Sequence, residues 1–252
     1  MNLYHAHSTL ESIVATNYVY ASVLHFFGIA FYEAPADSLK TACQKKGLDT
    51  QTVINSLESV SVHKQEKPDY ALTELPVDVI IDYLKDAHKT FIRHKLPYVG
   101  DLIANIQLKM FDDPDVAKDL KFVFPIFAED FIQHIYEEEK KCFGYIETLN
   151  SIQADKVLSN KQLIELNKYS IQKFWKEHET DDDEMEGIRE LTNNYQITPA
   201  TGLYTKVVYS ELQNFEKDLL IHSRIENTIL FPKAQKLETE MVEKLRRRSR
   251  LN

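Results

Sequence analysis

The chain has 252 residues and a formal net charge of −9 at pH 7. This length allows one or two domains with a substantial core, and the negative charge argues against general nucleic-acid binding. Only six Gly and eight Pro are present, which favours long helices over a β-rich or low-complexity protein. No apolar run approaches the roughly 20 residues of a membrane span, and the first residues lack the pattern of a signal peptide. We therefore expect a cytoplasmic, all-α protein without a nucleic-acid or membrane partner, whose two distant cysteines, Cys43 and Cys142, are reduced thiols.

Helix-capping patterns predict a small three-helix domain at the start of the chain. Ser8 and Glu11 form a capping-box pattern for a helix over residues 8–27, which Gly28 stops or bends. A second helix is predicted from Pro35 to about residue 47, and a third from about residue 49 to 62. These helices define an N-terminal domain at residues 1–64, followed by a polar, proline-bearing linker at residues 65–75.

Four longer helices are predicted from residue 76 onward. They cover approximately residues 77–110 with a bend at Pro97, residues 115–150, residues 160–193, and residues 198–232 with a continuation beyond Pro232. Helices of thirty residues are about 45 Å long, which suits an antiparallel up-down four-helix bundle. We place this bundle at residues 76–237. A basic C-terminal tail at residues 238–252 is then either a solvated helix end or a contact for an acidic partner.

Two stretches of the predicted bundle share the pattern D-x-x-x-H-x-x-x-E, at residues 130–138 and 218–226. In a helix, a histidine and a glutamate four residues apart lie on the same face, one turn from each other. Both stretches are rich in apolar residues, and a buried imidazole and carboxylate are costly unless something compensates them. A metal ion does so, because it binds the neutral imidazole and the ionised carboxylate.

Single histidines in the other two long helices complete a repeat. His88 precedes His134 by 46 residues, and His178 precedes His222 by 44 residues. The chain thus repeats one helical hairpin, whose first helix provides a lone histidine and whose second provides H-x-x-x-E. The repeat predicts six metal ligands: His88, His134, Glu138, His178, His222 and Glu226. Four imidazoles and two carboxylates suit two metal ions, with the carboxylates free to bridge them.

Other polar residues near the motif have open roles. Asp130 and Asp218 lie one turn before the ligand histidines and either orient an imidazole or pair with Lys or Arg at the surface. Glu177 is adjacent to a predicted ligand, in an acidic run that either forms a solvated face or breaks the third helix. The alternative is that Glu177 and Glu179, which flank His178, reach the metal site and support it. We expect Glu137 and Glu139 to point away from the face of Glu138. The five remaining histidines, His5, His7, His25, His63 and His94, have no place in the repeat.

The donor set admits iron, manganese, zinc and copper, and a pair of ions with bridging carboxylates favours iron or manganese. Six protein ligands are fewer than two six-coordinate ions require. An open or solvent-held position should therefore remain for a small molecule such as O₂ or NO.

At these residues the chain resembles the hemerythrin-like iron–sulfur cluster repair di-iron proteins, the RIC family. The resemblance rests on His88 before Leu96-Pro97, on residues 134–138, on the pair Glu177-His178, and most specifically on residues 222–232. It also includes N-terminal segments at residues 27–31 and 39–49. It implies two non-haem iron ions with an oxo or hydroxo bridge, terminal histidine ligands and bridging glutamates. The chain departs from the family at residues 32–35, Tyr-Glu-Ala-Pro, where members carry adjacent cysteines and glycines, and at Gly144, which stands where the matching motif ends in proline.

The resemblance implies a nitrosative or oxidative stress protein that repairs damaged iron–sulfur clusters, or that reduces NO at the di-iron centre. Its partners would be O₂, NO or related molecules and iron–sulfur proteins. The alternative is reversible O₂ or NO binding or sensing without turnover, which the absent cysteine pair favours. A third reading is a structural zinc site in an interaction scaffold. Four aromatic residues in the N-terminal domain suggest a homodimer: Phe26, Phe27, Phe31 and Tyr32.

Overall fold

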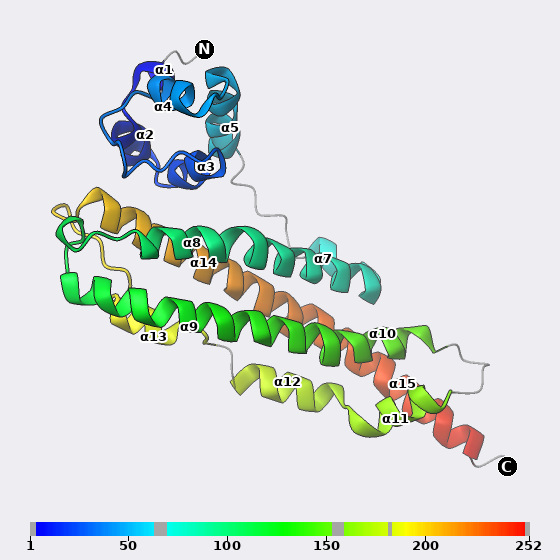
Figure 1. Ribbon diagram of the computed structural model, residues 1–252. Coiled ribbons are helices and arrows are strands. Elements are labelled where there is room, and N and C mark those ends of the chain that lie inside the picture. Colours follow the sequence, from blue (N-terminus) through cyan, green and yellow to red (C-terminus); the bar gives the residue numbers. More distant parts are fainter. Residues whose placement is uncertain (1–3, 63–69, 153–158, 181–182, 250–252) are drawn as a thin grey trace. The chain divides into compact units, whose positions relative to one another are not determined.

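The computed structural model describes residues 4–62, 70–152, 159–180 and 183–249. Within these ranges every regular element is a helix (Figure 1), and the only β pairing is an isolated bridge between Thr9 and Ser38. The all-α prediction is confirmed. Among the described residues, none of the helices combines the length and apolar character needed to cross a membrane.

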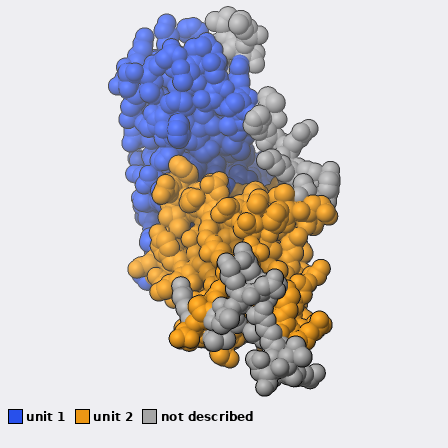
Figure 2. All heavy atoms as spheres, turned by 90° about the vertical axis from the view of Figure 1, so that its right-hand side faces the viewer, with its two compact units in different colours: residues 1–66, 95–125, 187–216 blue, residues 67–94, 126–186, 217–252 orange. Residues whose placement is uncertain are grey.

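The chain divides into two compact units (Figure 2). The first comprises residues 1–66, 95–125 and 187–216, and the second comprises residues 67–94, 126–186 and 217–252. This division passes through the long helical segments, so it does not test the domain boundaries predicted at residues 64, 75 and 237. Those boundaries stay predictions. The predicted linker at residues 65–75 begins outside the described residues and ends with the short helix α6 (Tyr70–Thr73).

The described residues 4–62 of the first unit contain five helices where three were predicted. They are α1 (Tyr4–His7), α2 (Leu10–Thr16), α3 (Tyr20–Phe26), α4 (Leu39–Lys46) and α5 (Thr50–Val62). The predicted helix over residues 8–27 is interrupted at Asn17, whose backbone is extended and whose side-chain oxygen accepts a hydrogen bond from the Val19 N–H at 3.2 Å. Asn competes with the helix in this way because its short side chain offers the backbone a local partner.

The ends of these helices show which capping predictions were correct. Thr9, and not Ser8, caps α2 by accepting a hydrogen bond from the Ser12 N–H. Asp49 accepts from the Thr52 N–H at 2.8 Å, as a cap of α5 should. Gly47 ends α4 with a left-handed φ of 67°, a conformation that glycine adopts without a steric penalty.

The first two long helical segments each contain a π-helical stretch. The first runs through α7 (Val77–Thr90), η1 (Phe91–Lys95) and α8 (Leu96–Ala104), followed by the 3₁₀ turn η2 (Leu108–Met110). The second runs through α9 (Pro114–Glu138), η3 (Glu139–Phe143) and α10 (Gly144–Ser151). The fourth segment has the same design, with α14 (Leu203–Ile225), η4 (Glu226–Leu230) and α15 (Phe231–Ser249). A widened turn of this kind is often found at functional sites.

The positions of Pro97 and Pro232 give a physical reason for two of the π-helical stretches. Each proline follows the end of its stretch by two residues. A proline has no N–H for the carbonyl four residues earlier, and its ring clashes with that carbonyl in a regular α-helix. A wider turn at this point relieves both problems. The predicted bend at Pro97 therefore takes the form of η1, and the predicted continuation beyond Pro232 is α15.

The third long segment is broken, which corrects the prediction of one helix over residues 160–193. It consists of α11 (Asn160–Lys168), α12 (Ile171–Thr180) and α13 (Glu186–Leu191). Tyr169 ends α11 in an extended conformation with φ −114° and ψ 156°. The chain after α13 passes through three consecutive left-handed residues, Asn193, Asn194 and Tyr195.

The core of the second unit connects the helices that carry the predicted ligands. Side chains from α7, η3, α10, α12, α14, η4 and α15 form one apolar cluster, whose most buried members are Ile80, Leu84, Phe143, Ile146, Ile171, Leu230 and Ala234. Full burial of a large apolar side chain stabilises the fold by about 1.5–3 kcal/mol. The cluster therefore packs these helical segments against one another.

In the first unit, the start of α14 depends on an acid from the connection between η2 and α9. Both carboxylate oxygens of Asp112 accept from the Gly202 N–H, at 3.0 and 3.1 Å, and the Asp112 N–H donates to the Thr205 hydroxyl. We expect Asp112→Ala to lower the free energy of unfolding by about 1 kcal/mol, because the helix start loses its acceptor. Denaturant unfolding measures the change. Asp119→Ala, which removes an exposed acid of α9, is the control; an equal loss in both variants would contradict the assignment.

Candidate metal centre

His88 is the most buried of the four predicted histidine ligands. Only 2% of its side chain is exposed, and its ring stacks on Phe143 with centroids 5.6 Å apart and planes 3° from parallel. Its Nδ1 lies 2.8 Å from Oε1 of Glu139. Burial opposes a charge on this imidazole, but Glu138, Glu139 and Glu226 outweigh that effect and raise its pKa. The ring is thus fixed by its neighbours on both its flat face and its Nδ1 edge.

His88, Glu138, His222 and Glu226 form one group of donor atoms that could hold a metal ion. One donor atom from each residue lies within 4.8 Å of the others. Nε2 of His88 is only 2.9 Å from Nε2 of His222. These residues come from α7, the end of α9, α14 and the start of η4, so three helical segments meet at this point.

His134, Glu138 and His178 form a second group that meets the same distance criterion. His134 lies on α9 and His178 on α12, so the fourth ligand-bearing helix joins the centre here. Phe231 packs against the His178 ring, with centroids 5.4 Å apart and a nearly perpendicular arrangement. The structure therefore brings all six predicted side chains together, in two groups that share Glu138.

Both glutamates lie between the two groups, with one oxygen toward each. The oxygens of Glu138 are 3.4 Å from Nε2 of His88 and 3.6 Å from Nε2 of His178. Those of Glu226 are 3.0 Å from Nε2 of His222 and 2.9 Å from Nε2 of His178. Each carboxylate therefore presents one oxygen to each set of imidazoles.

Glu226 provides the test of whether these residues fit a metal. Its side chain is completely buried, and neither oxygen has a hydrogen-bond partner of good geometry among the described residues. Burial raises its pKa, but the imidazoles of His222 and His178 outweigh this and hold the pKa well below its usual range. A buried, ionised carboxylate whose lone pairs lack hydrogen-bond donors calls for a cation. The donor set of imidazoles and carboxylates fits a divalent transition metal.

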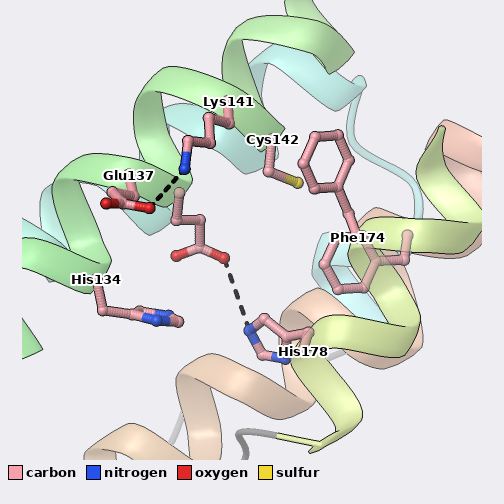
Figure 3. A pocket seen from close by; sticks show the side chains of 8 residues that line it. His134, Glu137, Lys141, Cys142, Phe174 and His178 are labelled. Atoms are coloured by element: carbon pink, nitrogen blue, oxygen red, sulfur yellow. Dashed lines mark hydrogen bonds and ion pairs between the residues drawn. The ribbon is translucent and has the colours of Figure 1, made fainter. Parts of the chain in front are cut away.

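A cavity of about 370 Å³ borders all three residues of the second group (Figure 3). It is lined by His134, Glu137, Glu138, Lys141, Cys142, Phe174, His178 and Phe231. The exposed side-chain fraction is 38% for His134 but 2% for His88, so the two groups differ in access. The Cys142 thiol is buried at the cavity wall, and burial together with Glu138 and Glu226 raises its pKa well above the usual value. It therefore remains a protonated thiol.

Glu139 does not belong to the six predicted ligands, but its carboxylate contacts one of them, His88. The sequence did not indicate this contact. The prediction that Glu139 points away from the face of Glu138 is based on the geometry of a single helix. It does not include His88, which approaches Glu139 from the neighbouring α7. Glu184 is a second missed residue, with Oε1 3.8 Å from Nε2 of His134. The acidic run was a signal for it, but only the fold shows which acid of the run returns to the centre.

The three residues predicted to support the ligands have different outcomes. Asp130 is exposed, and Asp218 is partly buried. The side chain of Glu177 lies outside the described part of the chain. Their proposed supporting roles stay predictions. Glu137 points away as expected, since its carboxylate is 2.6 Å from Nζ of Lys141 at the cavity rim (Figure 3).

The fold and the site define a class: an all-helical protein with two adjoining histidine–glutamate groups that could hold metal ions. Comparison with known proteins narrows it. No family model matches the chain. The chain is 21% identical over 226 residues to the iron–sulfur cluster repair protein ScdA of Staphylococcus haemolyticus. The aligned region covers 90% of this chain and 97% of that protein. The chain is 26% identical over 215 residues to the repair protein YtfE of Dickeya chrysanthemi, covering 82% of this chain and 87% of that protein, and 25% identical over 197 residues to YtfE of Escherichia coli, covering 78% and 82%. The predicted resemblance to the iron–sulfur cluster repair proteins is confirmed.

The contact between Glu139 and His88 generates a prediction. A carboxylate on the outer nitrogen of a ligand histidine fixes its tautomer and orientation, and its loss commonly weakens metal binding about 10- to 100-fold. We expect Glu139→Ala to weaken binding of one of two Co²⁺ ions by that factor, measured by competition with a chromophoric chelator. Glu137→Ala is the matched control, because it removes the adjacent carboxylate that faces Lys141. If both variants bind like the wild type, the supporting role of Glu139 is wrong.

Proposed function

We propose that the chain is a non-haem di-iron protein that takes part in the repair of damaged iron–sulfur clusters. The observation that carries this proposal is the position of Glu138 and Glu226, each with one oxygen toward either histidine group. The relatives named as iron–sulfur cluster repair proteins, which match most of the chain's length, support it. Iron is the proposed metal because paired carboxylate-bridged sites in helical bundles favour iron or manganese.

The proposed architecture is a hemerythrin-like, antiparallel four-helix bundle at residues 76–237. Its helices would be α7 with α8, α9 with α10, α12, and α14 with α15, since these segments supply the six ligands. A small N-terminal domain at residues 1–64, a linker at residues 65–75 and a basic tail at residues 238–252 complete the proposed organisation. The sequence repeat of 46 and 44 residues between ligand histidines supports an arrangement of two similar hairpins.

Some side chains of the proposed centre enclose it, and others border the cavity. His88 and His222 close one side, where Phe91 packs edge-on against His222 with centroids 5.8 Å apart and Phe143 covers His88. Glu139 holds the His88 ring through Nδ1. His134 and His178 border the cavity, so a small molecule would reach the centre from that side. Iron bound there would supply the redox change and the affinity for small nitrogen or oxygen species that the protein side chains lack.

The proposed partners are therefore NO, O₂ or related molecules, and damaged iron–sulfur proteins, in the cytoplasm. Either cluster repair or reduction of NO would be the activity. The second candidate function is reversible O₂ or NO binding or sensing without turnover. It is favoured by Tyr32, which occupies the region of the absent cysteine pair and packs against Tyr204 with ring centroids 5.2 Å apart.

A homodimer through the N-terminal aromatic residues also stays a proposal. Phe31 is buried and stacks on Tyr204, so it is not part of an exposed face. Phe26, with 77% of its surface exposed, is the residue available for such a contact.

Metal analysis tests the proposal directly. We expect protein from iron-replete cells to contain about two iron ions per chain and to show an absorption band typical of an oxygen-bridged iron pair. His222→Ala should lose most of this iron and the band, because it removes a ligand from the more enclosed group. His94→Ala, which removes an exposed histidine of η1, should keep both. Zinc in the wild type, with redox silence and a large loss of melting temperature on chelation, would instead support the structural reading.

Consumption of NO separates the two candidate functions. With a chemical reductant present, a protein that reduces NO should continue to consume it well beyond one equivalent per centre. A binding or sensing protein should stop after the sites are filled. An NO electrode provides the measurement, and His222→Ala gives the background rate. A wild type that stops at stoichiometric uptake would contradict NO reduction.

A further inference from the structure

Helix α12, which carries His178, has a structural problem that the other ligand-bearing helices do not share. It is only ten residues long, and the extended backbone of Tyr169 separates it from α11. His88, His134 and His222 lie on helices that continue directly into a π-helical stretch and another helix. The placement of His178 therefore depends on contacts that α12 makes with neighbouring helices.

One such contact is made by Glu238 of α15. Its Oε1 accepts a hydrogen bond from the backbone N–H of Ile171, the first residue of α12, at 3.1 Å. The first N–H groups of a helix have no partner within the helix, and the positive end of the helix dipole lies there. A carboxylate from another helix thus serves as the cap of α12.

The same oxygen of Glu238 also binds α10. The Tyr145 hydroxyl donates to it at 2.7 Å, and the Tyr145 side chain is almost fully buried. Burial and the hydrogen bond to Glu238 both raise the Tyr145 pKa, so the phenol remains protonated and continues to donate. The Tyr145 hydroxyl therefore holds the Glu238 carboxylate in place while the same oxygen accepts from the Ile171 N–H and caps α12.

The path from this cap to the metal centre is short and packed. Ile171 is completely buried, the Trp175 ring lies 6.0 Å from that of Phe231, and His178 packs on the same Phe231. Seven residues, or about two turns and 10 Å of helix, separate Ile171 from His178. A slide or rotation of α12 at its start would consequently displace the imidazole.

We propose that Glu238 is a positioning residue for His178, which fixes α12 against α15 and α10 and thereby completes the second metal group. The inference rests on the proposed function only in that two metal ions are expected to bind. It assigns a role to a residue twelve positions beyond Glu226, outside the ligand motif.

The test uses Co²⁺ alone, titrated into the metal-free, full-length chain by calorimetry. Wild type should bind two ions. Glu238→Ala should weaken one of the two dissociation constants at least about tenfold and leave the other unchanged, as the loss of an orienting partner does. Glu238→Gln, which keeps an acceptor oxygen, should restore wild-type binding. Glu240→Ala, an exposed acid of the same helix, is the control.

Two further variants separate positioning from general stability. Tyr145→Phe removes one donor but leaves the cap on Ile171, so it should lower the melting temperature without weakening Co²⁺ selectively. The double variant of His178→Ala and Glu238→Ala should bind like His178→Ala alone, because the residue that Glu238 positions is already absent. Where Glu238→Ala does not fold, Glu238→Asp keeps the charge, shortens the reach and should give the same selective loss.

Unchanged constants in Glu238→Ala would overturn the inference. So would equal weakening of both constants, or additive losses in the double variant, since either indicates a general effect on the fold. A wild type that binds fewer than two ions would overturn the proposed di-metal function itself, and this outcome is visible before any Glu238 variant is measured.

Discussion

A buried carboxylate between imidazoles is the interaction on which the rest of the second unit depends. Glu226 has no exposed surface and no hydrogen-bond partner of good geometry among the described residues, yet the histidines beside it keep it ionised. Such a group destabilises a fold unless positive charge compensates it. His222 of α14 and His178 of α12 provide that compensation, and the apolar cluster around Phe143, Ile171 and Leu230 packs beside them.

The helices are adapted to the centre through their irregular parts. The π-helical stretch η4 begins at Glu226, η3 begins immediately after Glu138, and η1 begins three residues after His88. Each widened turn thus begins at or shortly after a predicted ligand, as π-helical stretches often do at functional sites. Helix α12 lacks such a stretch and obtains its placement from Glu238 and from packing against Phe231.

The two halves of the centre are chemically similar but differ in their surroundings. His88 and His222 are enclosed by Phe143 and Phe91, whereas His134 borders a cavity whose rim carries Glu137 and Lys141. This asymmetry provides a protected side and an accessible side within one cluster of histidines and glutamates. It is compatible with both turnover and reversible binding, because either function requires a small molecule to enter and a centre that is otherwise shielded from water.

Periodicity and spacing in the sequence were sufficient to identify the helical class and the six residues that the fold brings together. The reason is that a histidine and a glutamate four residues apart share a helix face whatever the rest of the fold does. The sequence could not predict the partners that come from other helices. Glu139 contacts His88, Glu184 approaches His134, and Glu238 caps α12, and each contact depends on which helices are neighbours. The interruption at Asn17 and the widened turns before Pro97 and Pro232 have local causes, in the Asn17 side chain and in the two prolines. Local patterns report what a residue prefers, whereas burial decides which side chains must compensate one another.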